Sequence, residues 1–286
     1  MDNALEVEGL RKTYGDFTLD NVSFTLPVGY IMGFVGQNGA GKTTTIRLIL
    51  NMAPREGGAV RVFGMDNLAD ELAVKQELAT VFDEIFFVDS WRVREVEKVV
   101  SGFYVNWSSG QFRELLVKFS LQPDKRVKEL SRGMKMKLML AVAMSHGARL
   151  LILDEPTSGL DPVARDELLD ILREYIKDGD KSVFFSTHIS SDLEQIADYL
   201  TLIDQGRIFY TGTKDALLDD FRIVKGGTSS LTEDLRGKLI GLSVTNTGFD
   251  GMMRTADAVG LPDGVITEPP TIDAMLVHIS KGGNNR

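Results

Sequence analysis

The residues whose types and spacing point most directly to chemistry form one segment, Gly36-Gln37-Asn38-Gly39-Ala40-Gly41-Lys42-Thr43. It matches the pattern G-x-x-x-x-G-K-[ST]. An apolar run at 31–35 predicts a buried strand before it, and the spacing at 44–50 predicts a helix after it. Strand, glycine loop and helix form the setting that this motif requires. A glycine-rich turn that matches by chance is the alternative, and the flanking pattern disfavours it.

Glycines let the backbone wrap closely around a polyphosphate, so that successive N–H groups and the helix N-terminus face its negative charge. We expect Lys42 to reach the β- and γ-phosphates and the Thr43 hydroxyl to bind Mg²⁺. The residues of this loop predicted to bind the nucleotide are Gly36, Asn38, Gly39, Ala40, Gly41, Lys42, Thr43 and Thr44.

Two acids follow the apolar run at 150–153, and they suggest catalysis beside the phosphate loop. Asp154 is expected to bind Mg²⁺, and Glu155 to polarise the water that attacks the γ-phosphate. The alternative is a strand end that simply emerges into solvent. His188 ends another apolar run, at 182–188, where an imidazole could hydrogen-bond the γ-phosphate and hold the water. A lone histidine is more often structural, but its place at the edge of the same expected sheet favours the site.

The elements that must position these residues alternate between strand and helix. The pattern predicts an α/β protein with an open, mostly parallel sheet and ligands at the carboxyl ends of the strands. Residues 5–10 and 17–26 alternate apolar and polar side chains and predict an antiparallel strand pair. Tyr14 lies at the turn between them, as a nucleotide-stacking aromatic or simply as a turn residue. Ser131 is a candidate N-cap for a helix that follows it.

Composition narrows the class of protein. The chain has 286 residues, 43% of them hydrophobic, which suffices for one large domain or a large domain with a small appendage. Its net charge of −9 is poorly suited to binding nucleic acid phosphates. There is no cysteine, so disulfides and thiol chemistry are excluded. The first ten residues are acidic rather than signal-like, and no apolar run approaches the roughly 20 residues of a membrane span.

Several motifs in order resemble those of the ATP-binding subunits of ABC transporters. Residues 36–43 resemble Walker A and residues 150–155 Walker B. Leu130-Ser131-Arg132-Gly133-Met134 resembles the signature, Ser158-Gly159-Leu160-Asp161 the D-loop, and His188 the switch histidine. The resemblance covers residues 1–220. It implies a P-loop ATPase core with an antiparallel β subdomain and a helical subdomain at about 84–146.

The resemblance also assigns roles. It favours Tyr14 as the adenine-stacking aromatic. It implies that two copies sandwich two ATP molecules, so that Lys42 and Glu155 of one face Ser131 and Gly133 of the other, with Asp161 also at the nucleotide. Ser131 and the amides after it, at a helix N-terminus, would then grip the γ-phosphate only when the dimer closes.

Two departures from the family pattern stand out. Arg132 replaces a usual glycine of the signature and Met134 a usual glutamine, whereas Gly133 keeps close backbone approach possible. Arg132 has two readings, an added phosphate or partner contact or a tolerated surface residue. Asp83 occupies the place of the Q-loop glutamine. A carboxylate binds Mg²⁺ more strongly than an amide but cannot donate a hydrogen bond while ionised, so we expect Mg²⁺ binding at Asp83 with altered turnover or coupling.

Phe86, Phe87, Trp91 and Phe103 lie where this family receives its membrane subunit, although any one of them could be core. The resemblance implies an ATP hydrolase that dimerises on ATP at the inner face of the cell membrane and powers a separate permease, an exporter of the ABC-2 type for peptides or drugs. Residues 221–286 are expected to form a small α+β accessory subdomain. The alternatives are a soluble ATPase of translation or DNA maintenance and an ATP-operated sensor that hardly turns over.

Overall fold

A six-stranded sheet carries the predicted catalytic residues. The computed structural model describes residues 2–82 and 86–283. The strand order is β10-β9-β3-β8-β7-β6, with β3 at Ile31–Val35, β6 at Leu78–Val81, β7 at Leu150–Asp154, β8 at Ser182–Thr187, β9 at Tyr199–Asp204 and β10 at Arg207–Thr213. All neighbours pair in parallel except β9 and β10, which form a hairpin. The predicted open, mostly parallel sheet is confirmed.

The central strands are short and fully buried because side chains on both faces meet apolar layers. Successive residues of β7 point to opposite faces. Leu151 and Leu153 enter a core shared with the helices α5, α6 and α7. Leu150 and Ile152 enter a second core, which they share with residues of α1 and of the N-terminal sheet. The sheet and the apolar cores on its two faces fix the ends of β7 and β8. Glu155 directly follows β7, and His188 directly follows β8.

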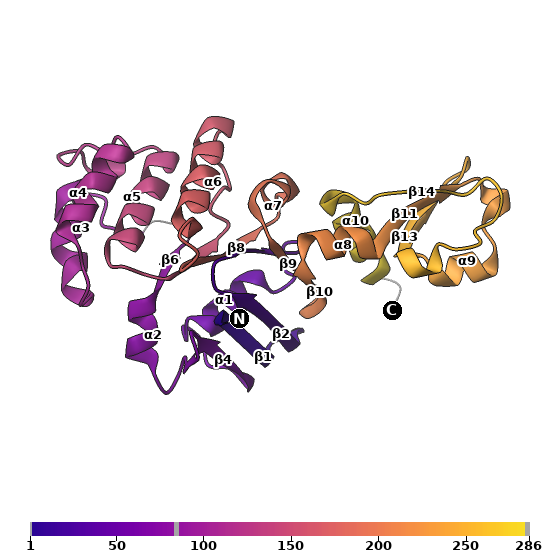
Figure 1. The fold of residues 1–286 in the computed structure, drawn as a ribbon, viewed down its shortest axis with the longest axis horizontal. Coiled ribbons are helices and arrows are strands. Elements are labelled where there is room, and N and C mark those ends of the chain that lie inside the picture. Colours follow the sequence, from indigo (N-terminus) through magenta and orange to yellow (C-terminus); the bar gives the residue numbers. More distant parts are fainter. Residues whose placement is uncertain (1, 83–85, 284–286) are drawn as a thin grey trace.

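The N-terminal sheet has the order β2-β1-β4-β5 and lies beneath α1 (Figure 1). Its strands are β1 at Asn3–Tyr14, β2 at Phe17–Pro27, β4 at Gly57–Val62 and β5 at Met65–Asp66. β1 and β2 pair antiparallel up to the facing residues Tyr14 and Phe17. The predicted strand pair is therefore confirmed, and its turn brings these two aromatic residues beside the phosphate loop.

The helical region stands at one end of the molecule (Figure 1). It comprises α3 at Val93–Val100, α4 at Ser109–Lys118 and α5 at Arg132–Ser145, with short 3₁₀ turns at Ser101–Phe103 and Val127–Glu129. Ser108 accepts a hydrogen bond from the Gln111 amide and starts α4 as a helix separate from α3. Ser131 caps α5 as predicted, accepting from the Met134 amide at 3.3 Å.

The other helices before residue 221 are α1 at Lys42–Ile49, α2 at Glu71–Glu77, α6 at Pro162–Ile176, α7 at Ser190–Ile196 and α8 at Lys214–Asp220. α7 begins two residues after His188. The helix ends before Ala197 because Asp198 is drawn into the sheet. The Asp198 carboxylate accepts from the Ile31 amide at 2.9 Å, and its own amide donates to the Ile31 carbonyl at 2.9 Å.

Beyond α8 a third sheet, with the order β12-β13-β11-β14, lies at the other end of the molecule (Figure 1). Its elements are β11 at Phe221–Gly226, β12 at Ile240–Val244, β13 at Phe249–Arg254, β14 at Ile266–Glu268, α9 at Glu233–Lys238 and α10 at Ile272–Gly283, with 3₁₀ turns at Thr228–Ser230 and Thr255–Asp257. Ile272, Met275 and Ile279 on α10 share one apolar core with Leu193 and Ile196 on α7. Among the described residues, no helix is long and apolar enough to cross a bilayer.

Candidate nucleotide-hydrolysis site

The phosphate loop joins β3 to α1 in a shape that its glycines permit. Gly41 has φ +115° and stands immediately before Lys42, the first residue of α1. At Gly36 a β-carbon would lie 2.3 Å from the Ile203 carbonyl oxygen, so a side chain would collide with β9. The loop therefore lies tightly against the central sheet and presents the N-terminus of α1 to the cleft.

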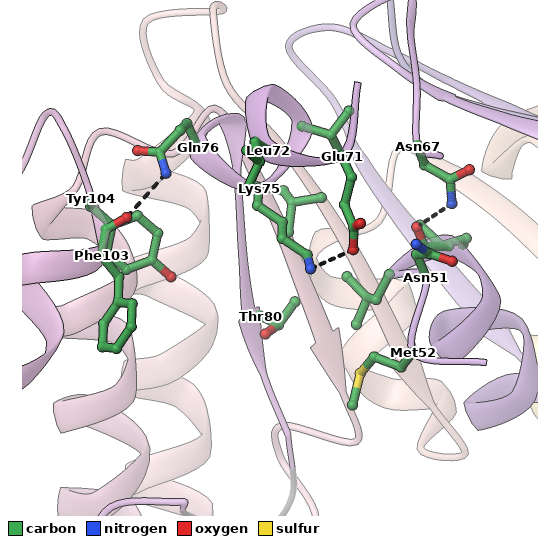
Figure 2. A pocket seen from close by; sticks show the side chains of 14 residues that line it. Asn51, Met52, Asn67, Glu71, Leu72, Lys75, Gln76, Thr80, Phe103 and Tyr104 are labelled. Atoms are coloured by element: carbon green, nitrogen blue, oxygen red, sulfur yellow. Dashed lines mark hydrogen bonds and ion pairs between the residues drawn. The ribbon is translucent and has the colours of Figure 1, made fainter. Parts of the chain in front are cut away.

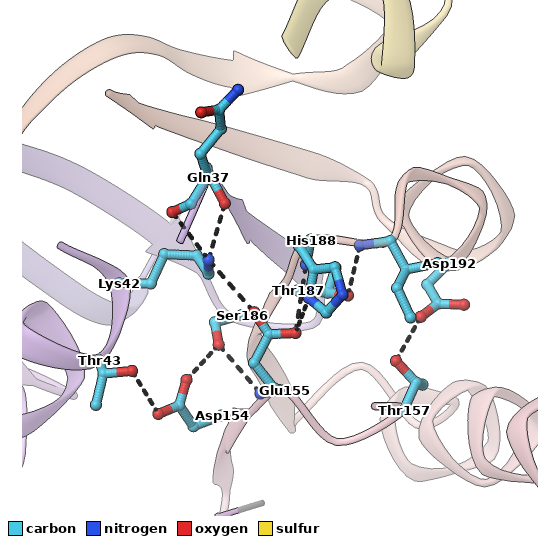
Figure 3. A network of polar contacts seen from close by, with 12 residues as sticks. Gln37, Lys42, Thr43, Asp154, Glu155, Thr157, Ser186, Thr187, His188 and Asp192 are labelled. Atoms are coloured by element: carbon cyan, nitrogen blue, oxygen red, sulfur yellow. Dashed lines mark hydrogen bonds and ion pairs between the residues drawn. The ribbon is translucent and has the colours of Figure 1, made fainter. Parts of the chain in front are cut away.

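Lys42 is held inside this loop. Its side chain is 6% exposed, and Nζ donates to the Gly36 carbonyl at 2.8 Å and to the Gln37 carbonyl at 3.4 Å. Nζ also lies 3.3 Å from Glu155 Oε1. The ammonium group is thus placed by the backbone of its own loop, close to the carboxylate expected to act on water (Figure 3).

Asp154 and Thr43 place two oxygen atoms together at the start of α1. The Thr43 hydroxyl donates to Asp154 Oδ2 at 3.0 Å, and the Ser186 hydroxyl donates to Asp154 Oδ1 at 2.5 Å. Asp154 is 8% exposed, so its carboxylate is both buried and oriented. A hydroxyl and a carboxylate are hard oxygen donors of the kind that Mg²⁺ uses beside nucleotide phosphates, so this pair fits the ion.

Glu155 is held in an unusual backbone conformation at the end of β7. Its φ is +52°, which costs a residue with a β-carbon of order 1 kcal/mol or more. Its amide donates at 3.1 Å both to the carbonyl and to the hydroxyl oxygen of Ser186 on the neighbouring strand. These bonds hold the turn that directs the carboxylate back toward Lys42 and His188.

His188 meets this carboxylate directly. His188 Nδ1 lies 2.7 Å from Glu155 Oε2, and the His188 amide donates to the same oxygen at 3.4 Å. An ionised carboxylate only accepts hydrogen bonds, so Nδ1 carries the proton in this contact. Nε2 is left for other contacts, and the ring is about half exposed. Sequence reasoning placed both residues near the γ-phosphate but did not foresee that they bond to each other.

These residues surround one cleft of about 760 Å³. Tyr14 is 47% exposed at its edge, with Lys12 Nζ 5.3 Å from the centre of its ring. The predicted residues that line the cleft are Tyr14, Asn38, Gly39, Gly41, Lys42, Thr43, Thr44, Asp154, Glu155 and His188. Gly36 contributes a carbonyl to Lys42 instead, and Ala40 is buried beneath the loop.

Three cleft residues were not foreseen: Phe17, Arg47 and Ser158. A signal for each was present in the sequence. Phe17 faces Tyr14 across the β1–β2 turn, Arg47 stands one helical turn after Thr43, and Ser158 belongs to the segment compared with the D-loop. Arg47 adds a second cationic side chain to the lining of the cleft.

Ser131, Gly133 and Asp161 lie elsewhere, and none is among the described residues that line the cleft. Ser131 caps α5, and Gly133 approaches α6 so closely that a β-carbon would lie 3.2 Å from that of Ala164. Asp161 caps α6, accepting from the amides of residues 163 and 164 at 3.0 Å. Asp83, the expected metal ligand of the Q-loop, lies outside the described residues.

Arg132 is positioned by the D-loop segment of its own chain. A β-carbon on Gly159 would lie 2.3 Å from one guanidinium nitrogen of Arg132 and 2.9 Å from its central carbon. Gly159 has φ +65° and no side chain, and this leaves room for the guanidinium group. The large residue at this signature position is exposed but lies against Gly159, just before α6.

A second hollow of about 440 Å³ lies between α2, the end of α1 and the helical region (Figure 2). Large apolar side chains stand exposed along it: Leu72 at 83%, Phe103 at 72% and Met52 at 59%. Gln76 spans it, donating to the Phe103 carbonyl at 3.2 Å and accepting from the Val105 amide at 3.0 Å. We call this hollow the α2 groove.

The four aromatic residues expected at the membrane subunit divide into two pairs. Phe86 and Phe103 are each 72% exposed, whereas Phe87 and Trp91 pack partly buried against the main core. Nearby, His146 is 2% exposed and stacks on Tyr104 with ring centres 3.8 Å apart. Burial lowers the pKa of His146 from 6.5 to about 4.

Comparison with known proteins agrees with the chemistry of the cleft. The family model described as "ABC transporter" matches residues 19–158. Nod factor export ATP-binding protein I of Paraburkholderia xenovorans is 34% identical over 223 residues, which are 75% of this chain and 72% of that protein. Bacitracin transport ATP-binding protein BcrA of Bacillus licheniformis is 31% identical over 212 residues, 73% of this chain and 69% of that protein.

A solved structure described as "Structure of ATP binding subunit of ABC transporter" has a TM-score of 0.68 at 28% identity, and the match covers 75% of this chain and 91% of that one. The resemblance to ATP-binding subunits of ABC transporters inferred from the motifs is confirmed by the two relatives, the first of which is named for export. The chain belongs to the ATP-binding subunits of ABC transporters and is an ATP-hydrolysing enzyme of that family.

Proposed function

We propose that two copies of this chain close around two ATP molecules on the inner face of the cell membrane and energise a separate permease that exports peptides, drugs or other amphipathic compounds. The observation that carries this proposal is the arrangement of Lys42, Thr43, Asp154, Glu155 and His188 in one cleft. The name of the relative from Paraburkholderia xenovorans, which specifies export, supports the direction.

Closure by a second copy is supported by the position of the signature residues. Ser131 and Gly133 stand at the N-terminus of α5, apart from the cleft of their own chain. A helix N-terminus attracts a phosphate, since its first amide groups have no partners within the helix. A second copy placed head to tail would bring this terminus to the γ-phosphate held by Lys42.

The chain's own residues divide the work of hydrolysis. The N–H groups at the start of α1 and the Lys42 ammonium bind the phosphates, and Tyr14 stacks on the base. Glu155 accepts a proton from the attacking water, and His188 holds the carboxylate through Nδ1 while Nε2 faces the reacting phosphate. Thr43 and Asp154 would hold Mg²⁺, which offsets charge on the phosphate oxygens when bound.

The α2 groove is the proposed contact for the permease. Exposed apolar side chains gathered in a hollow mark a site of interaction with another protein more often than ordinary surface does. Leu72, Phe103 and Met52 line it beside the ion pair of Glu71 and Lys75, whose charged atoms are 2.6 Å apart. This mixture fits a short amphipathic helix of the permease, which would bury its apolar face on Leu72 and Phe103.

The proposal is tested by affinity capture of the tagged chain from detergent-solubilised native membranes, with the bound proteins identified by mass spectrometry. We expect a stoichiometric multi-span membrane protein. Leu72→Glu places a charge in the groove and is expected to abolish capture while leaving basal ATPase activity unchanged. Val117→Glu is the matched control, because Val117 is 81% exposed on α4 and does not line the groove.

Two results would contradict the proposal. Recovery only with ribosomes or DNA-bound factors would assign the chain to a soluble ATPase instead. Equal capture by the Leu72→Glu and Val117→Glu variants would show that the α2 groove does not contact the permease. The other parts of the proposal would be unaffected by this result. Dimerisation is measured separately by light scattering of the Glu155→Gln variant with and without ATP, and a monomer under both conditions would refute closure.

A further inference from the structure

A buried carboxylate behind the cleft joins three segments that carry the chemistry. Asp192, on α7, is 1% exposed. Its Oδ2 accepts from the Thr157 hydroxyl at 2.6 Å, and its Oδ1 pairs with the Arg165 guanidinium on α6. Arg165 also donates to the Ser191 hydroxyl at 2.6 Å. Figure 3 shows Thr157 and Asp192 directed toward one another beside Glu155 and His188.

The positions of these residues in the sequence show which segments the cluster connects. Thr157 follows Glu155 by two residues, and Asp192 follows His188 by four. Arg165 lies one helical turn after Asp161, which caps α6. The cluster of Thr157, Arg165 and Asp192 therefore connects the segment of the catalytic glutamate, the first turn of α6 and the segment of the switch histidine.

Such a cluster fixes geometry more strictly than apolar packing does. Leu193 and Ile196 anchor α7 in the main core, but apolar contact is not directional and lets a short helix slide or rotate. A buried carboxylate needs its partners in place, since leaving it unpaired is costly. The carboxylate of Asp192 thus admits one register of α7 relative to residues 157 and 165.

We propose that Asp192 is a positioning residue for ATP hydrolysis, which acts by holding His188 against Glu155. The bond between Asp192 and Thr157 fixes the position of the two segments that carry His188 and Glu155. It thereby maintains the contact between His188 Nδ1 and Glu155 Oε2, which are 2.7 Å apart. Asp192 touches neither the nucleotide cleft nor its lining residues Lys42 and Thr43, so its loss affects the chemical step and leaves nucleotide binding intact.

The test compares Asp192→Ala, Asp192→Asn and Thr157→Val with a control, Tyr175→Phe. Tyr175 is also on α6, is 5% exposed and donates to the Ala148 carbonyl, so the control removes a buried hydrogen bond without touching the cluster. We expect kcat to fall about tenfold or more in Asp192→Ala, since small misplacements of catalytic groups carry large costs. KM for ATP should stay within about twofold, as expected when only transition-state contacts are lost.

Two further readouts separate positioning from loss of stability. Asp192→Asn keeps the shape and can still bond to Thr157 and Arg165, so its kcat should lie much closer to wild type. The chain has three histidines, so the ring proton signals of His188 can be assigned by NMR through their loss in His188→Ala. These signals should shift in Asp192→Ala and in Thr157→Val and stay in place in Tyr175→Phe.

The proposal is overturned if, at a temperature where all variants are folded, Asp192→Ala and Thr157→Val keep the kcat of the control. It is also overturned if the His188 signals do not move in either variant. Thr157→Val changes one hydroxyl to a methyl group, so it keeps the test decisive even if Asp192→Ala does not fold.

Discussion

Glu155 Oε2 and His188 Nδ1 are 2.7 Å apart, and the other oxygen of the same carboxylate lies 3.3 Å from Lys42 Nζ. One side chain thereby connects Lys42, which is expected to bind phosphate, with His188, which directly follows β8. A change at Glu155 consequently acts on two neighbours as well as on water. Substitutions at separate positions of the cleft distinguish these effects.

Replacing the glutamate tests its role as the base. Glu155→Gln keeps the size of the side chain but cannot accept a proton, so kcat should fall about 10²- to 10⁴-fold. ATP binding should persist, because Lys42 remains bonded to the carbonyls of Gly36 and Gln37. The measurement is phosphate release alongside nucleotide binding. Glu174→Gln, at the far end of α6, is the control, and an equal small effect in both variants would exclude Glu155 as the base.

Removing the exposed aromatic ring tests base stacking. Tyr14→Ala should raise KM for ATP about tenfold, since stacking of a base on an aromatic residue is worth about 1–3 kcal/mol. Tyr14→Phe keeps the ring and should match wild type, and kcat should not change in either variant. Steady-state kinetics measures both. Unchanged KM in Tyr14→Ala would move the stacking role to Phe17, which lines the same cleft.

His146 predicts an acid-sensitive fold. Burial lowers its pKa to about 4 in the folded chain, whereas the unfolded chain takes up a proton near 6.5. The unfolded state then binds more protons below this value, so the free energy of unfolding should fall as pH decreases from about 6.5 to about 4. His146→Phe preserves the ring stacked on Tyr104 and removes this contribution.

Urea unfolding of both proteins across this pH range provides the measurement. The difference in stability between neutral and acidic pH should be smaller in His146→Phe than in wild type. Above pH 7 the histidine is neutral in both states, so the two stability curves should run parallel there. Equal acid sensitivity in the two proteins would show that other groups dominate.

Asp83 predicts an altered use of Mg²⁺. Asp83→Gln restores the family's usual amide, which can donate a hydrogen bond but binds Mg²⁺ less strongly. We expect a changed ATPase rate with Mg²⁺ dependence retained, because Thr43 and Asp154 still offer oxygen ligands. The rate is measured over a Mg²⁺ titration. If neither the ATPase rate nor the Mg²⁺ concentration that gives half of the maximal rate changes, Asp83 does not contact the ion.

The fold was accessible from the sequence because its strongest signals are local. A glycine loop between an apolar strand and a helix defined β3 and α1, and short apolar runs defined β7 and β8. The ends of these strands then placed Asp154, Glu155 and His188 at one edge of the sheet. Motif order supplied the family, which the relatives confirm.

What the sequence could not give depends on contacts between distant residues. The end of α7 follows from bonds between Asp198 and Ile31, which no local pattern reveals. The position of Arg132 over Gly159 likewise depends on where α6 begins. In the third sheet β11 pairs with β13 and β14 across long connections, and this order is not encoded in any single strand.

The shared core of α7 and α10 has a consequence for how the protein is made. Ile272, Met275 and Ile279 belong to the same core as Leu193 and Ile196, but they are translated long after them. Until α10 leaves the ribosome, the part of α7 that contacts it stays open to chaperones or to other nascent chains. The packing of α7, which begins two residues after His188, is therefore completed only once α10 has been synthesised.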